Sequence, residues 1–242
     1  PAPHTPVLPT EQFQGKSEAG RYGDFVLQVD DTVGQIMATV ERLNISTDTL
    51  IIVTSDNGPE RYMLARKEEY NHASNHHFRG MKRDAWDGGH RIPFIASWPA
   101  KIRPGSQSQE TICLTDLMAT AAEIVGLSLP EDAGEDSYSI LPALLGKKTD
   151  QPIREATVHH SVNGDFAIRQ GNWKLILCQG SGGNNYETGP NAIQVGNPPI
   201  QLYNLDEDMS EQRNLWDQHP EIVGNLTHLL ERYRASDHSV NR

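Results

Sequence analysis

The sequence has few of the features that mark membrane, nucleic-acid-binding or disulfide-rich proteins. None of its apolar runs approaches the roughly 18 residues of a membrane-spanning helix, so we expect no membrane span. Its 21 Lys and Arg residues are outnumbered by 32 Asp and Glu residues, and the net charge of −11 argues against a nucleic-acid partner. An anionic substrate would therefore have to be recognised by a few local cations.

Cysteine is rare, and each of the two cysteines lies in an apolar run. This setting favours buried free thiols at Cys113 and Cys178 over a disulfide. The first residues, PAPHTPVLP, lack a methionine and the charged start of a signal peptide. We therefore expect the 242 residues to be an excised or processed piece of a longer protein, and their number suits more than one domain or subdomain.

Residues 50–60, LIIVTSDNGPE, contain the first informative motif. The apolar run at its start is typical of a strand covered on both faces, as in a parallel sheet. Asp56 and Asn57 follow that strand, at the end where open α/β sheets bind their ligands. Carboxylate and amide oxygens suit Ca²⁺ or Mg²⁺ better than Zn²⁺. Asp-Asn-Gly is also a common turn sequence, so the motif alone leaves a metal site and a plain turn open.

Residues 79–99, RGMKRDAWDGGHRIPFIASWP, contain the second informative motif. Gly80 and the pair Gly88-Gly89 permit close backbone approach. The segment also concentrates four candidate cations in an acidic chain, at Lys82, Arg83, His90 and Arg91. A cationic glycine loop before a short apolar strand, predicted over residues 92–98, is a plausible anion-binding site. Taken alone, Lys82 or Arg91 would more often be a solvated side chain or a structural ion-pair residue.

The periodicity of apolar residues predicts the remaining elements of the first part. Spacings of three and four residues predict helices over residues 20–44 and 108–127, and a helical turn over residues 140–145. The polar residues 59–78 predict an irregular surface loop that rims a cleft. The histidines of this loop have no companion at a recognised zinc spacing, and these are His72, His76 and His77.

The sequence changes character after the polar stretch 147–152, which is a candidate domain boundary. Short strand-like runs follow at 156–160, 166–170, 173–177 and 201–205, with Gly171-Asn172 as a hairpin turn. Residues 180–199 predict a long loop, and residues 220–233 a closing amphipathic helix. We therefore expect an α/β unit over residues 1–150 and a small antiparallel sheet with one helix over residues 151–242. His159 and His160 face opposite sides of a strand and are interpreted as structural.

The combined motifs resemble the type I sulfatases of the alkaline phosphatase-like superfamily. Matching segments occur in the family's order over nearly the whole chain: PHTPVLPTEQFQGKS, RYGDFVLQVDDTVG, TLIIVTSDNGPE, RGMKRDAWDGGHRIPFIASWP, LPALLGKK, FAIRQGNWKLI and QLYNLDEDMSEQRNL. The SDNGP strand end with K-x4-[DE]-G-G-x-R is specific as a combination. The resemblance implies the C-terminal part of a mixed α/β sheet with flanking helices, followed by a small antiparallel-sheet-plus-helix subdomain.

The resemblance also implies roles for individual residues. Asp56 and Asn57 resemble the second half of a calcium site, which Mg²⁺ could also occupy. Lys82 resembles the lysine that contacts the sulfate, and we expect it to act in both binding and catalysis. His4 resembles the histidine near the scissile ester oxygen, a candidate proton donor.

His90 and Arg91 are the remaining expected substrate-binding residues. The resemblance gives Arg91 a supporting role at the glycine turn or metal region.

Sulfatases use a formylglycine made from the Cys or Ser of a C/S-x-P-x-R motif, which this sequence lacks. We expect that residue in an N-terminal half outside this chain. The chain alone is then expected to be inactive, to bind metal weakly and, through an unpaired sheet edge, to self-associate. The resemblance implies a sulfated small molecule or carbohydrate as substrate and a periplasmic or extracellular location. A phosphate or phosphonate ester hydrolase of the same superfamily and a non-catalytic binding module stay open as alternatives.

Overall fold

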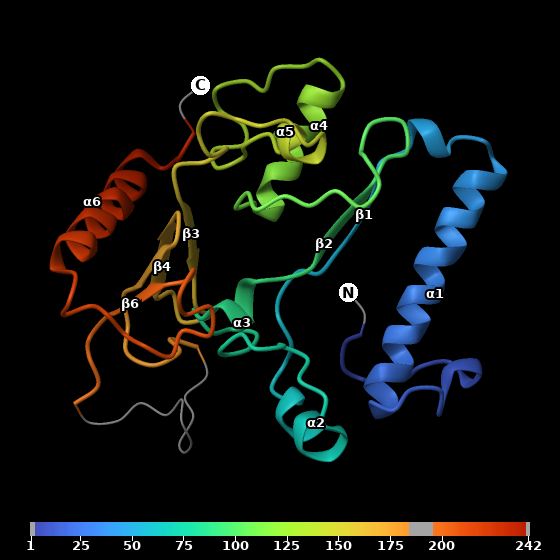
Figure 1. Ribbon diagram of the computed structural model, residues 1–242, viewed down its shortest axis with the longest axis horizontal. Coiled ribbons are helices and arrows are strands. Elements are labelled where there is room, and N and C mark those ends of the chain that lie inside the picture. The colour runs from blue at the N-terminus through green and yellow to red at the C-terminus, as the bar shows by residue number, and fades with distance from the viewer. Residues whose placement is uncertain (1–2, 184–195, 241–242) are drawn as a thin grey trace.

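The computed structural model describes residues 3–183 and 196–240, which form a mixed α/β structure with two separate sheets (Figure 1). Within these ranges no helix combines the length and apolar character that crossing a bilayer requires. The elements follow in the order η1 Glu11–Phe13, α1 Gly20–Arg42, η2 Ser46–Asp48, β1 Ile51–Thr54, α2 Met63–Tyr70, α3 Asp87–His90, β2 Phe94–Ser97, η3 Leu114–Asp116, α4 Leu117–Ile124, α5 Leu141–Leu144, β3 Thr157–His160, β4 Phe166–Gln170, β5 Trp173–Ile176, β6 Gln201–Asn204 and α6 Pro220–Ser236.

The first sheet consists of β1 and β2, which pair antiparallel with Ile51 opposite Ser97 and Thr54 opposite Phe94. Both predicted strands are therefore present, but the expectation of parallel pairing with both faces covered is wrong for this chain. The residues of β1 are half-buried, and Thr54 is exposed. An apolar run indicates side chains that favour burial, and it does not encode the direction of the neighbouring strand.

Two helix predictions in the first part need correction. Residues 59–78 were expected to be irregular, yet they contain α2, because Leu, Ala, Arg, Lys and Glu are strong helix formers. Asn71 ends α2 in the left-handed conformation, with φ of 52°. The helix predicted over residues 108–127 begins only at η3 and α4. The buried Asp116 carboxylate accepts the backbone N–H groups of Cys113 at 2.7 Å and Tyr138 at 3.1 Å, which starts the helix there.

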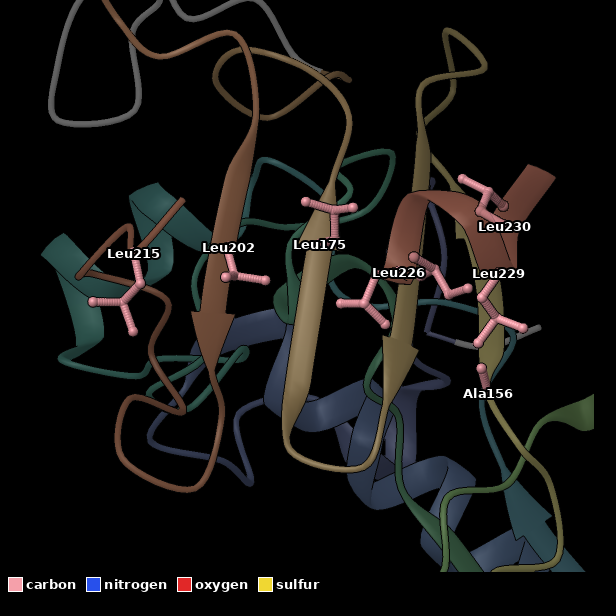
Figure 2. Packing of buried hydrophobic residues seen from close by; sticks show 8 residues of the cluster. Ala156, Leu175, Leu202, Leu215, Leu226, Leu229 and Leu230 are labelled. Carbon is pink, nitrogen blue, oxygen red and sulfur yellow. The ribbon is translucent and has the colours of Figure 1, made fainter. Parts of the chain in front are cut away.

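The second sheet is antiparallel in the order β3-β4-β5-β6, as the sequence predicts. Gln170 pairs with Trp173 across the predicted Gly171-Asn172 turn, where Gly171 has a positive φ of 58°. Helix α6 lies along one face of this sheet (Figure 1). Figure 2 shows Leu226, Leu229 and Leu230 of α6 over the same face of the sheet as Leu175, Leu202 and Ala156, and the buried cluster consists of Ala156, Ile168, Leu175, Leu202, Leu215, Leu226, Leu229 and Leu230.

The opposite face of the second sheet is covered by the segment that carries the second motif. Successive strand residues point to opposite faces, so Ile168 and Leu175 pack under α6 whereas Ala167 and Ile176 pack against Trp86. Trp86 is fully buried, and α3 follows it directly. In Figure 1, α3 accordingly lies between β2 and the second sheet. One face of the second sheet thus packs against the segment that forms the glycine loop.

Candidate active site

The turn after β1 and the glycine loop before β2 meet through their main chains. The Gly58 N–H donates to the Gly89 carbonyl at 3.0 Å, and the Lys82 N–H donates to the Pro59 carbonyl at 2.8 Å. A Cβ atom on Gly58 would lie 1.8 Å from the Gly88 carbonyl oxygen, which is closer than any side chain allows. We call this meeting point, formed by residues 56–59, Lys82 and Gly88-Gly89, the site corner.

Asp56 and Asn57 bear the side-chain oxygen atoms of the site corner that could hold a cation. Asp56 is exposed and Asn57 is half-buried. The Asn57 side-chain nitrogen donates to the Gly58 carbonyl at 2.9 Å, which leaves the amide oxygen as the atom suited to a cation. Two hard oxygen-bearing side chains fit Ca²⁺ or Mg²⁺ in kind, but calcium takes about six to eight oxygens. Across residues 3–183 and 196–240, no cluster of three or more His, Cys, Asp or Glu side chains could hold a metal.

The four candidate cations of the glycine loop have different surroundings. Arg83 forms a 2.6 Å ion pair with Glu60, so its charge is locally compensated. Arg91 lies 3.4 Å from Asp87, and its guanidinium stacks on the Phe78 ring at 4.8 Å. Lys82 is half-buried, and its backbone belongs to the site corner. The glycine loop is therefore less positive than its sequence suggests.

His90 carries no positive charge at neutral pH, contrary to its inclusion among the cations. Burial, and after it the charge of Lys174, lower the pKa of His90 to about 4. Its ring lies 4.2 Å from the ring of His159, and burial likewise lowers the pKa of His159. The His159 Nε2 atom lies 3.0 Å from the Ala85 carbonyl. Within the described part of the chain, the buried His90 Nε2 atom has no hydrogen-bond partner.

The remaining predicted features are His4, the loop at 180–199 and the two cysteines. His4 is exposed, and its Nδ1 atom lies 2.8 Å from the Thr5 carbonyl. The hydrogen bonds of the described residues do not join it to Asp56, Asn57 or Lys82. The predicted long loop at 180–199 falls largely on residues 184–195, outside the described residues. Cys113 and Cys178 are free and half-buried, so they do not pair with each other.

The sequence did not predict the buried ionic cluster next to the glycine loop, which consists of Lys174, Asp87 and Glu211. Lys174 on β5 is fully buried, 2.7 Å from an Asp87 oxygen and 2.8 Å from a Glu211 oxygen. Burial alone would raise the pKa of Asp87, but the charge and the hydrogen bond of Lys174, together with the charge of Arg91, lower it to about 2. Burial raises the pKa of Glu211 to about 7, against the opposing charge of Lys174. The only sequence signal was a lysine inside the apolar run WKLIL.

The fold places the chain in the alkaline phosphatase-like superfamily. The structure matches that of a Bacteroides thetaiotaomicron protein, solved in work on the metabolism of multiple glycosaminoglycans, with a TM-score of 0.80 and 36% identity. The match covers 97% of this chain and 48% of that one. A sulfatase from Pseudoalteromonas sp. shares the fold at a TM-score of 0.76 with 23% identity, over 96% of this chain and 46% of the other.

The sequence comparisons then define the family. The Sulfatase family model matches residues 1–127, and the chain belongs to the type I sulfatase family. It is 41% identical to the N-acetylgalactosamine-6-O-sulfatase of Bacteroides thetaiotaomicron over 94% of this chain and 44% of that protein. It is 38% identical to human steryl-sulfatase over 60% of this chain and 25% of the relative. The chain thus spans less than half the length of these curated relatives.

Proposed function

We propose that the protein to which this chain belongs hydrolyses a sulfate ester of a carbohydrate. The observation that supports the proposal is the site corner, where main-chain hydrogen bonds join the turn after Asp56 and Asn57 to the loop that bears Lys82, in a member of the sulfatase family. A carbohydrate is favoured over a steroid because the similarity to an N-acetylgalactosamine-6-O-sulfatase extends over 94% of the chain, against 60% for a steryl-sulfatase.

Each residue of the proposed site has a distinct role. Asp56 and Asn57 would hold one side of a Ca²⁺ or Mg²⁺ ion, with the other ligands from outside this chain. The Lys82 ammonium would bind the sulfate and stabilise the negative charge that develops on its oxygens. His4 would donate a proton to the leaving alcohol oxygen. When present, the metal and a formylglycine from an N-terminal half would supply charge neutralisation and the nucleophile.

Arg91 and His90 have weaker structural support as substrate-binding residues. Arg91 points to Asp87 and Phe78, so we propose that it braces the glycine loop and reaches the substrate only from its exposed edge. His90 is neutral and packed on His159, so it would act through a neutral hydrogen bond.

The proposal extends to the chain as an isolated piece. Without a nucleophile and a complete metal shell, it would show no turnover and would bind calcium weakly. We further propose a boundary near residue 150, self-association through the open edges of the first sheet, and action in the periplasm or outside the cell.

The test compares ester hydrolysis by the full-length protein and its variants. With 4-nitrophenyl sulfate and calcium, Asp56→Ala and Lys82→Ala should each lower kcat/KM by about 100-fold or more, as expected for loss of transition-state charge stabilisation. Lys101→Ala is the matched control, because Lys101 is exposed on a turn outside the site corner. The kcat/KM of this variant should equal that of the wild type. Sulfate turnover that survives both site substitutions would contradict the assignment.

The same enzyme distinguishes the alternative chemistry and the substrate. A preference for 4-nitrophenyl phosphate over the sulfate would favour the phosphate ester hydrolase. Faster turnover of N-acetylgalactosamine 6-sulfate than of the aryl sulfate would support a carbohydrate substrate.

A further inference from the structure

Lys174 joins the second sheet to the loop that forms the site corner. It lies on β5, where its neighbour across the ladder is Tyr203 of β6, and no part of its side chain is exposed. Its ammonium contacts Asp87 at 2.7 Å and Glu211 at 2.8 Å. A fully buried ammonium is unfavourable unless it is paired, so these two carboxylates determine where the ammonium can lie.

Glu211 adds a second set of contacts to the same loop. One of its carboxylate oxygens accepts the Asp87 backbone N–H at 2.7 Å, and its own carbonyl accepts a hydrogen bond from the Arg79 guanidinium at 2.8 Å. The Arg79 guanidinium stacks on Trp86 at 3.8 Å. Glu211 is fully buried and has a positive φ of 52°, a conformation that residues other than glycine seldom adopt. Tertiary contacts therefore hold Glu211 in a strained position next to Asp87.

The contacts continue from Asp87 to the site corner without interruption. Gly88 and Gly89 follow Asp87 in α3, the Gly88 N–H donates to the Arg79 carbonyl at 2.7 Å, and the Gly89 carbonyl accepts the Gly58 N–H at 3.0 Å. A movement of Asp87 would therefore displace the turn that bears Asp56 and Asn57, and with it the Lys82 backbone that this turn holds.

We propose that Lys174 and Glu211 are positioning residues for the sulfatase site, which hold the glycine loop at the distance at which Asp56, Asn57 and Lys82 converge. This inference rests on the proposed function for its catalytic consequence, but the mechanical coupling can be measured separately. Neither residue touches the substrate. A misplacement of about 1 Å by a distant substitution can lower a reaction rate by about 100-fold, so the coupling has a measurable effect.

The first experiment measures the coupling by hydrogen exchange in the full-length protein. Lys174→Met keeps an unbranched side chain that is one atom shorter and removes its charge. We expect exchange in peptides covering residues 56–60 and 79–91 to rise by about tenfold or more, beyond any change in α1. Arg154→Met is the matched control, since Arg154 forms a similarly buried ion pair with Asp116, and its side-chain hydrogen bonds go to residues outside the glycine loop. A rise of the same size in the control, or a uniform rise along the chain, would overturn the proposal.

The second experiment uses Glu211, so that the proposal can be tested even where Lys174→Met does not fold. Glu211→Gln retains an oxygen that can accept the Asp87 N–H, whereas Glu211→Leu removes it. We expect Glu211→Leu to lower kcat by about tenfold or more with a smaller change in KM, and Glu211→Gln to recover most of that loss. Equal kcat values for the two variants at a temperature where both are folded would refute positioning.

The two readouts separate the two hypotheses. In one outcome, Lys174→Met raises hydrogen exchange selectively in the 56–60 and 79–91 peptides, but the wild type has no sulfatase activity. That outcome would support the positioning of the loop and refute the proposed function. In the other outcome, sulfatase activity depends on Lys82, but Lys174→Met causes no selective rise in hydrogen exchange. That outcome would support the function and refute the positioning.

Discussion

The two sheets of the chain differ in how their side chains are covered. All four residues of β6 are buried, because α6 packs on one face of the second sheet and the Trp86 segment on the other. In the first sheet, by contrast, Ile95 of β2 is 62% exposed, and the residues of β1 are only half-buried. Helix α1 has the same character, with Ile36 at 52% and Met37 at 47% exposure.

This difference shows that similar hydrophobic patterns can have different structural outcomes. The apolar faces of α1 and β2 are strongly patterned for burial, yet the described residues leave them accessible. The chain covers less than half the length of the curated sulfatases described above, and we expect the remaining part of such a protein to cover these faces. In contrast, segments of this chain cover both faces of the second sheet. The buried ionic cluster links that sheet to the glycine loop of the first part.

The largest expected effect concerns the core of the second sheet. Leu230→Ala removes a fully buried side chain of α6 and should lower the free energy of unfolding by about 2–5 kcal/mol, through lost burial and a residual cavity. Ile95→Ala in the isolated chain should change it by less than about 0.5 kcal/mol, because that side chain is exposed. Urea unfolding followed by circular dichroism measures both. Equal losses would remove the contrast between the sheets, and a larger Ile95→Ala loss in the full-length protein would show that its face becomes covered.

The second prediction concerns pH and the cluster under the site corner. Because the pKa of Glu211 is raised from 4.5 to about 7, the folded state keeps a proton there that the unfolded state has released. Stability should therefore fall as the pH rises through this window, and Glu211→Gln should flatten that part of the profile. Urea midpoints at about pH 5 and about pH 8 measure the slope. Glu231→Gln, at an exposed ion pair on α6, is the control and should leave the slope unchanged.

The third prediction concerns α1 and has the opposite dependence on pH, because here stability should fall as the pH decreases. Asp24 of α1 is buried and accepts the backbone N–H groups of Gly15, Lys16 and Ser17 at 2.8–2.9 Å. The hydrogen bond from Gly15 leads the causes that lower the pKa of Asp24 below its usual 3.8. This carboxylate therefore stabilises the fold above about pH 4, and its contribution is lost as the pH falls through the lowered pKa.

The comparison for Asp24 uses a neighbour on the same helix. Asp24→Asn should lower the urea midpoint at neutral pH, with a difference from the wild type that shrinks in acid. The exposed Asp30→Asn is the matched control. A loss at Asp24 that stays constant down to about pH 2 would show that packing, and not the ionised carboxylate, is responsible.

Sequence reasoning worked where local pattern determines the structure. The periodicity of α1, the short strand-like runs of β3 to β6 and the Gly171-Asn172 turn each depend on neighbouring residues, and the corresponding elements lie close to their predicted bounds. The local pattern of residues 59–78 was misread, since polarity was given more weight than the helix propensity of α2.

Other features depend on partners distant in sequence, and the pattern could not reveal them. The pairing of Lys174 with Asp87 spans 87 positions, so no spacing rule connects the two. The neutrality of His90 likewise results from burial against the second sheet. The joining of the segments that bear Asp56, Asn57 and Lys82 was expected only from the family resemblance, and the chemical roles of these residues stay predictions.

The contact between Gly58 and the Gly88-Gly89 pair has a consequence for redesign of the protein. Because main chain touches main chain there, the frame of the site contains no side chain that could be exchanged for another of similar size. In a library that randomises each position, Gly58, Gly88 and Gly89 should accept almost no substitution, whereas the exposed Arg83 should vary widely. Substrate preference could therefore be altered at the rim while the geometry of the site stays the same.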